Sequence, residues 1–251
     1  MSVGHWLSAP ARLLWPARCA ACDGYIAEAQ TFCAGCRSSL YRQDGVCLGC
    51  ALPASGVGGD PSRCARCRRV PFPFQQARAV FQYGEAIAEA VLRMKHGGRR
   101  DLARRLGRLL APALAEALRD GGFGVGDAIV PVPLHRRRLH RRGFNQALEL
   151  LRGAWAVVDQ FSPPVADRPR IEIDLLRRVR ETRELGHAGP AARLAEVAGA
   201  FALAPGATAR GRRVLLIDDV FTTGATFTTC AETLREAGAG QISVLALARA
   251  V

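Results

Sequence analysis

Short apolar runs alternate with periodic stretches along most of the chain, and the two patterns predict different elements. A short apolar run bounded by polar residues indicates a strand, whereas apolar residues that recur every three or four positions indicate a helix. We expect strands over 77–83, 127–134, 171–175, 197–203, 213–217 and 242–248. Because parallel strands need long crossover connections, this alternation predicts an α/β fold with a mostly parallel sheet flanked by helices.

Two periodic stretches between the first two strands predict scaffold helices. Apolar residues recur at positions 86, 87, 90, 91 and 94, and again at 102, 106, 109 and 110. Each stretch therefore presents one apolar face to a core. Lys95 follows the first face and is the only lysine among 35 basic residues. An ammonium on a flexible stem suits a contact with pyrophosphate, although chance retention of a surface lysine explains it equally well.

The most informative strand ends in two adjacent acids. Four aliphatic residues at 214–217 precede Asp218 and Asp219. An uninterrupted aliphatic run is typical of a strand that is buried on both faces of a parallel sheet. The acids then lie at its carboxyl end, where open α/β sheets bind their ligands. The small residues that follow are Thr222, Thr223, Gly224, Ala225 and Thr226.

The acids and the small-residue segment together predict a site for a ribose phosphate. Paired carboxylates accept hydrogen bonds from two ribose hydroxyls and can hold a hydrated Mg²⁺ ion beside a pyrophosphate. A helix expected over 226–237 points its N-terminal N–H groups and the positive end of its dipole at the same place, which favours a phosphate. Gly224 permits a close approach of the backbone.

Residues 214–226 resemble the thirteen-residue phosphoribosyl-pyrophosphate (PRPP) motif of type I phosphoribosyltransferases at every position. That motif consists of hydrophobic residues, two acids and a Thr/Gly-rich loop. The resemblance implies that Asp218, Asp219 and residues 222–226 bind the phosphoribosyl group of a ligand. A magnesium-coordinating Asp pair of the phosphoacceptor type and an ordinary strand–turn–helix are the alternatives. The first of these usually ends an early strand and lacks the Thr-Thr-Gly loop.

Eight of the nine cysteines form four C-x-x-C pairs near the N-terminus. Two such pairs offer one ion the tetrahedral set of thiolates that Zn²⁺ prefers, so we expect two structural zinc sites. Disulfides would need an oxidising compartment. Neighbouring pairs can share an ion or the pairs can interleave, and by analogy with double ribbons we favour sharing by neighbours. The ligand sets are then Cys19, Cys22, Cys33 and Cys36, and Cys47, Cys50, Cys64 and Cys67.

Five arginines and two histidines lie within 135–146, directly after the second expected strand. We expect a loop there that precedes a helix capped by Asn145. Because this loop follows the carboxyl end of a strand, it faces the same crevice as Asp218. Its guanidinium groups suit the pyrophosphate of a ligand, with Arg136 and Arg137 as the candidate contacts. A solvent-exposed basic loop and a contact with a nucleic-acid backbone are the alternatives.

The chain carries a formal charge of +13, and its sequence pI is near 10.3. This charge favours phosphorylated ligands or polyanionic partners. It is spread along the chain, however, so a solvated basic surface accounts for the same composition. No stretch approaches the roughly 20 apolar residues of a membrane span. The N-terminal region has no continuous apolar signal core, and we therefore expect a soluble protein in the cytoplasm.

Three features together resemble the ComF/GntX family. They are the four C-x-x-C pairs, the run at 130–133 that leads through the arginines to 142–146, and the acidic motif near the C-terminus. Segments 175–182 and 197–201 also match the family. The resemblance therefore extends over nearly the whole chain.

This resemblance implies a double zinc ribbon over 1–70 joined to a phosphoribosyltransferase-like domain over 71–251. It also implies a role in competence and in the handling of incoming DNA. Two positions depart from the family pattern: Leu185 stands where Gln is common, and Glu196 where Asn is common. Polar contacts made from these two positions are therefore in question.

Two functions from different classes follow. In the first, the protein binds PRPP or a related ribose phosphate with Mg²⁺. If it turns the ligand over, it is a phosphoribosyltransferase that displaces pyrophosphate at the anomeric carbon, and the sequence assigns neither a catalytic residue nor an acceptor base. In the second, it is a non-catalytic adaptor whose zinc ribbons and arginine-rich segment bind single-stranded DNA. The expected partners are thus a phosphoribosyl compound, single-stranded DNA or the competence machinery.

Overall fold

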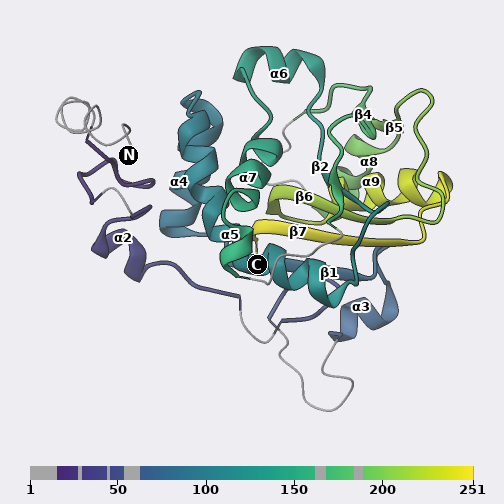
Figure 1. Ribbon diagram of the computed structural model, residues 1–251, viewed down its shortest axis with the longest axis horizontal. Coiled ribbons are helices and arrows are strands. Elements are labelled where there is room, and N and C mark those ends of the chain that lie inside the picture. Colours follow the sequence, from purple (N-terminus) through teal and green to yellow (C-terminus); the bar gives the residue numbers. More distant parts are fainter. Residues whose placement is uncertain are drawn as a thin grey trace, which may run out of the picture.

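The computed structural model of the 251-residue chain (Figure 1) describes residues 16–27, 30–43, 46–53, 63–161, 168–183 and 189–250. An α/β body around one parallel sheet contains most of these residues. Two small cysteine-containing units precede the body in sequence. They lie against it at separate places, one beside helix α4 (Glu85–His96) and the other beneath strand β1 (Gln76–Gln82).

A five-stranded parallel sheet forms the centre of the body. Its strands are β1, β2 (Ala128–Pro131), β3 (Arg170–Ile171), β6 (Arg213–Phe221) and β7 (Gln241–Arg249). They lie in the order β1, β7, β6, β2, β3, and every pairing in this sheet is parallel. The mostly parallel sheet predicted from the alternating patterns is confirmed.

The central strands are buried on both faces, as their aliphatic runs predict. The helices that cover them are α4, α5 (Arg100–Asp120), α7 (Gln146–Trp155) and α9 (Ala225–Glu236). On β6, Leu215 and Ile217 belong to the core shared with α4, α5 and α7, whereas Val214 and Leu216 belong to the core shared with α9. None of the helices in the described ranges has both the length and the apolar composition needed to cross a membrane.

Two segments that were predicted as strands of the main sheet behave differently. After the two residues of β3 the chain leaves this sheet and forms β4 (Leu176–Arg178), which pairs antiparallel with β5 (Phe201–Leu203). The strand predicted over 197–203 is wrong at its beginning, because helix α8 (Pro190–Val197) extends to position 197. Gly199, with a φ of 64°, then turns the chain into β5.

Helix α6 (Arg136–Arg142) occupies the segment that was predicted as a basic loop. The loop prediction is wrong because arginine and leucine are good helix formers, and the next glycine lies only at position 143. Gly143 ends the helix with a φ of 80°. Asn145 then caps α7, as predicted, since its side chain accepts a hydrogen bond from the N–H of Leu148 at 3.3 Å. A short 3₁₀ helix, η1 (Val158–Gln160), follows α7.

The first cysteine unit contains helix α2 (Ala34–Ser38) and is bound to α4 and α5. Arg93 on α4 forms an ion pair with Asp23 at 2.7 Å. Arg105 on α5 donates hydrogen bonds to main-chain carbonyls of the unit, which are those of Arg18, Gln30 and Thr31.

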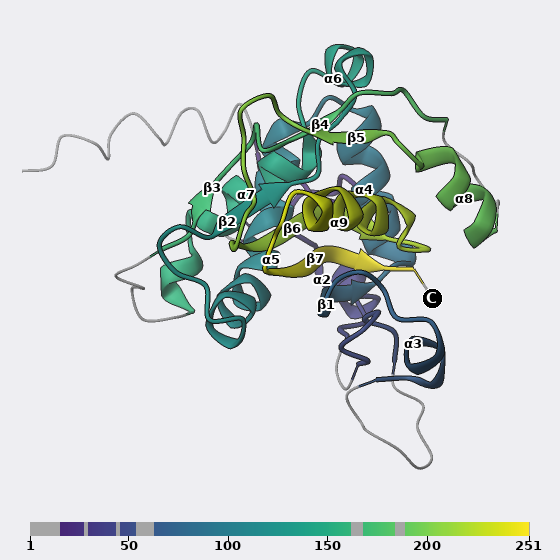
Figure 2. The same cartoon turned by 90° about the vertical axis from the view of Figure 1, so that its right-hand side faces the viewer.

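The second cysteine unit contains helix α3 (Ala65–Arg69) and is bound to the edge of the sheet. The N–H of Ala77 on β1 donates to the carbonyl of Leu48 at 2.7 Å. Figure 2 shows this unit at the opposite end of the body from α6. The domain boundary after residue 70 stays a prediction.

Candidate functional site

Strand β6 carries the paired acids within its hydrogen-bonded length. The predicted strand ended at residue 217, but β6 continues to Phe221 because β7 continues beside it and pairs Asp218 with Ala246. The acids still lie near the carboxyl edge of the sheet, where ligands bind in folds of this kind. Asp218 is 8% exposed and Asp219 is 4% exposed.

Lys95 is the charged partner of the acidic pair. The last turn of α4 brings its Nζ atom to 2.7 Å from Oδ2 of Asp219. The N–H of Asp219 donates to Oδ1 of Asp218 at 2.8 Å, and the N–H of Val220 donates to Oδ1 of Asp219 at 2.9 Å. A short local network therefore fixes both carboxylates.

The two acids have opposite pKa shifts. Burial, and then the charge of Asp219, raise the pKa of Asp218 to about 8. Burial acts in the same direction on Asp219, but the ammonium of Lys95 outweighs it and lowers the pKa of that carboxyl. Burial would also lower the pKa of Lys95, yet Asp219 raises it. At neutral pH the site thus contains a protonated Asp218 beside an ion pair.

Residues 222–224 connect β6 to α9 and residues 225–226 begin the helix, and we call residues 222–226 together the turn. Gly224 has a φ of 89°, and a Cβ atom on it would lie 2.6 Å from Cε1 of Phe72 and 2.8 Å from Cε2 of Phe221. Both the backbone conformation and the available space therefore require glycine. Helix α9 begins at Ala225, one residue before the predicted start, and the N–H of Ala225 donates to Oγ1 of Thr223 at 3.5 Å.

A cavity of about 310 Å³ opens beside the acids. Its lining includes Lys95, Asp218, Asp219 and all five residues at 222–226. The residues predicted to bind a phosphoribosyl group thus come together around one space.

The predicted pyrophosphate contacts on α6 are placed differently. Arg136 and Arg137 are exposed and are not part of the cavity lining, and Arg137 forms an ion pair with Glu181 at 3.3 Å. Arg138, on the same helix, lines the cavity. The basic segment therefore reaches the cavity through a neighbouring residue.

Arginines from three segments form a basic side of the cavity that the sequence did not assign. Nη2 of Arg138 donates to the carbonyl of Thr182 at 3.0 Å, and Nη2 of Arg178 donates to Oγ1 of the same threonine. Arg193 donates to Oγ1 of Thr222 at 3.4 Å. Burial, and then the charge of Arg138, lower the pKa of Arg178. The basic segment at 135–146 was a signal for Arg138 and the family match at 175–182 for Arg178, whereas nothing in the sequence distinguished Arg193 from the many other arginines.

Glu196, one of the two departures from the family pattern, also lines the cavity. Its Oε1 accepts a hydrogen bond from the N–H of Arg183 at 2.7 Å. The amide oxygen of an asparagine is also an acceptor, but its side chain is one methylene shorter than that of glutamate. Leu185 lies outside the described residues.

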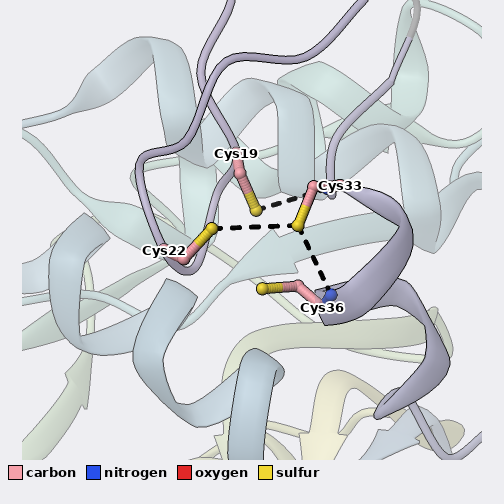
Figure 3. Close-up of side chains that lie close together, drawn as sticks. All are labelled: Cys19, Cys22, Cys33 and Cys36. Carbon is pink, nitrogen blue, oxygen red and sulfur yellow. Dashed lines mark hydrogen bonds between the residues drawn. The ribbon is translucent and has the colours of Figure 1, made fainter.

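The eight paired cysteines form two sets of four, and neighbouring pairs share each set. Figure 3 shows the first set, in which Cys19, Cys22, Cys33 and Cys36 converge. Within each set all four sulfur atoms lie within 4.8 Å of one another. Two S–S contacts, Cys22 to Cys33 and Cys50 to Cys64, are 3.8 Å. Zinc bonds of about 2.3 Å in a tetrahedron give the same separation, about 3.8 Å. The predicted sharing by neighbours is confirmed, and the sets are of zinc-ribbon type.

The thiols of each set cannot all ionise without a cation. In the first set, burial raises the pKa of Cys36 to about 12, and its neighbouring cysteines add to this shift. Burial acts in the same direction on Cys19, but amide donors, among them the N–H of Cys33, outweigh it and lower its pKa to about 6. A divalent ion removes this conflict because thiolates are its ligands.

Comparison with known proteins gives a family-model match and several relatives. Residues 11–68 match the model of a double zinc ribbon domain. The chain is 32% identical to the DNA utilization protein YhgH of Salmonella typhi, over 86% of this chain and 89% of that protein. It is 30% identical to competence protein F of Haemophilus influenzae, over 87% of this chain and 96% of that protein. With competence protein ComFC of Bacillus subtilis it shares 26% identity, over 86% of this chain and 83% of that protein.

Among solved structures, a hypoxanthine phosphoribosyltransferase from Staphylococcus aureus is similar with a TM-score of 0.35 and 14% identity. The similarity covers 58% of this chain and 64% of that one. A TM-score this low supports no inference about function.

Proposed function

The chain belongs to the ComF family, and from this membership and the geometry of the cavity we propose that it binds PRPP or a related ribose phosphate with Mg²⁺ and acts in DNA utilisation or competence. The observation that carries the proposal is that the paired acids, Lys95 and the turn at 222–226 line one cavity. Relatives that match most of the chain are named for DNA utilisation and for competence. We place this function in the cytoplasm, since thiolate zinc ligands persist where thiols stay reduced.

Each part of the lining suits one part of such a ligand. The carboxyl groups of Asp218 and Asp219 suit the two ribose hydroxyls, because the protonated acid donates a hydrogen bond and the ionised one accepts. The turn at 222–226 and the first N–H groups of α9 suit the 5′-phosphate. Lys95 and Arg138 suit the pyrophosphate, so that Arg138 takes the role that the sequence assigned to Arg136 and Arg137.

A magnesium ion fits the donors available at this site. Asp219 offers an ionised carboxylate, and Asp218 would offer a second one once the ion displaces its proton; Mg²⁺ accepts such oxygens directly or through water. Bound there, the ion would neutralise part of the phosphate charge. The residues of the chain then have the task of holding the ribose and excluding other orientations.

If an acceptor nucleophile is present, this arrangement suits displacement of pyrophosphate at the anomeric carbon. The bond from that carbon to the pyrophosphate oxygen breaks as the bond to the acceptor forms, and the bonding electrons leave with pyrophosphate. Arg138 and Arg178 on the basic side of the cavity stabilise this departing charge. The acids hold the ribose ring, so that positioning supplies much of the rate enhancement.

Thermal denaturation with PRPP and Mg²⁺ tests the proposal. A ligand at about 100 times its Kd adds about 2.7 kcal/mol of stability, which corresponds to a Tm increase of about 5–10 °C for a chain of this size. We expect this increase for the wild-type protein. The double variant Asp218→Asn/Asp219→Asn should show almost none relative to its own unliganded Tm.

The matched control neutralises two exposed acids on α9, in the variant Glu232→Gln/Glu236→Gln. It replaces the same number of carboxyl groups by amides outside the cavity and should keep the full Tm increase. An absence of any shift in the wild-type protein at millimolar PRPP, or an equal shift in both double variants, would eliminate the proposed ligand.

Single-stranded DNA is a second candidate ligand, favoured by the exposed arginines of α6, which include Arg136, Arg137 and Arg141. Contacts to phosphates make the logarithm of the binding constant fall linearly with the logarithm of salt concentration. We expect the variant Arg136→Gln/Arg141→Gln to reduce this slope by about 2, one unit for each lost contact. Binding that is absent or independent of salt in the wild-type protein contradicts this candidate.

A further inference from the structure

Arg249, at the end of β7, connects the second cysteine set to the turn at 222–226. It is 2% exposed. Its Nε donates to the carbonyl of Cys50 at 2.7 Å, and Nη1 donates to the carbonyl of Phe221 at 2.9 Å. Nη1 also donates to the carbonyls of Thr222 and Ala250. One guanidinium group thus holds a metal-ligand segment and the beginning of the turn together.

Phe72 makes a second connection between the same two parts. It packs, as Leu52 does, against the buried cysteines of the second set. Its ring also lies edge-on to Phe221, with 5.8 Å between centroids, and occupies the space that a Cβ on Gly224 would need. The second cysteine set therefore supports the turn through a polar and an apolar contact.

The first cysteine set has different neighbours. The contacts of its unit described above go to α4 and α5, through the Arg93–Asp23 pair and through Arg105. Arg105 resembles Arg249, since it also binds main-chain carbonyls of a cysteine unit. Its hydrogen bonds do not reach the turn at 222–226, so the two arginines form a matched pair for experiment.

The interior of the second unit consists mainly of cysteines. Among its described residues the buried cluster contains Cys47, Cys50 and Cys67, with a few half-buried neighbours. With so little apolar surface buried there, the unit would depend on metal–thiolate bonds for its structure. Loss of the ion would therefore release the carbonyl of Cys50 and the ring of Phe72 from their present positions.

We propose that Arg249 is a positioning residue through which the second cysteine set holds the turn at 222–226 ready for a phosphate. Metal occupancy at that set then determines the affinity of the turn for a phosphate monoester. Occupancy at the first set does not. This inference rests on the proposed function only for the identity of the ligand, because the mechanical connection exists in the unliganded protein.

Hydrogen–deuterium exchange of the amides at 222–226 in the unliganded protein tests the connection. Arg249→Lys keeps the charge but loses the planar fork that reaches separate carbonyls. We expect it to increase exchange of these amides about tenfold or more, the size expected when hydrogen bonds from a charged group are lost. Arg105→Lys should leave them unchanged. Both variants should retain two zinc ions per chain, which shows that the units remain folded.

Removal of single zinc ligands provides the second arm. Cys64→Ser should increase exchange at 222–226 and weaken binding of ribose 5-phosphate about tenfold or more. Cys22→Ser, the equivalent change in the first set, should do neither. Unchanged exchange in both Arg249→Lys and Cys64→Ser overturns the inference. It is also overturned if Arg105→Lys and Cys22→Ser increase exchange at 222–226 as much as these two variants do. If wild-type protein fails to bind ribose 5-phosphate, the proposed function fails, whereas exchange still decides the connection.

Discussion

At the scale of single residues, the two acids of the pair differ in their protonation state. Asp219 is ionised beside Lys95 at 2.7 Å, and Asp218 is held in its neutral form by burial and by the charge of Asp219. Acids with strongly shifted pKa values are common at functional sites. Burial of the ionised form of Asp218 lowers the stability of the free protein, at a position where the proposed ligand binds.

The stability of Asp218 variants should depend on pH in a defined direction. The pKa of Asp218 is about 8 in the folded protein, above its unfolded value of about 4. The stability due to its bound proton is therefore complete below about pH 4 and is lost as pH rises to about 8. Asp218→Asn mimics the protonated acid. Its advantage over the wild type should grow steadily across this range and level off above about pH 8.

Asp219→Asn should have the opposite effect when both variants and the wild type are compared by thermal denaturation across this pH range. In the folded wild-type protein the pKa of Asp219 is lowered. The stability that this carboxylate contributes is therefore present above its unfolded pKa and is lost as the pH falls through its folded pKa. The variant leaves the ammonium of Lys95 without its carboxylate. We expect a loss of about 1.5–3 kcal/mol at neutral pH. Equal changes in Tm for both variants at every pH would contradict the assignment of one neutral and one ionised acid.

The sequence allows prediction of the acids but not of Arg249 or Arg178. Two acids after an aliphatic run are a local signal, and Lys95 stands out because it is the only lysine. Arg249 binds carbonyls from segments that are far away in the chain. No neighbouring residue in the sequence distinguishes Arg249 from the other arginines. Only its contacts in the folded protein do so.

At the scale of elements, the order within the unit formed by β6, the turn and α9 was predicted, with α9 within one residue at each end and the strand four residues too short. An aliphatic run followed by a Thr/Gly segment determines this unit locally, so few distant contacts are needed. The segments at 171–175 and 197–203 were less predictable, because β4 and β5 pair with each other and leave the main sheet. Tertiary structure decides which strand each of these segments pairs with, and a short apolar run in the sequence does not reveal that choice.

The conformation of the turn gives a prediction for Gly224→Ala. The substitution forces a positive φ on alanine and places a methyl group 2.6 Å from Phe72. We expect a loss of about 2–5 kcal/mol in the free energy of unfolding, from the backbone and overpacking together. Binding of ribose 5-phosphate should also be lost.

Gly206→Ala is the control for this substitution. Gly206 also has a positive φ, 75°, but a Cβ there meets nothing within 4 Å. Chemical denaturation should show only the backbone effect of about 1–2 kcal/mol, with ligand binding retained. Retained ribose 5-phosphate binding in Gly224→Ala would contradict the role given to the turn.

At the scale of the whole molecule, the two zinc-ribbon units support different sides of one cavity. The first is bound to α4, which carries Lys95, and the second is bound through Arg249 to the turn. Cysteine spacing predicted eight ligands for two ions, and the analogy with double ribbons predicted that neighbouring pairs share each ion. It did not predict where the units lie on the body, because those contacts come from arginines and from main-chain carbonyls.

The central claim is that a ribose phosphate lies between the acids of β6 and the first turn of α9. A crystal structure of the protein with PRPP and Mg²⁺ tests it most directly. We expect the 5′-phosphate within hydrogen-bonding distance of main-chain N–H groups at 223–226, and the ribose hydroxyls beside Asp218 and Asp219. Density for the ligand elsewhere, for example on the arginines of α6, with this cavity containing only water, would contradict the account.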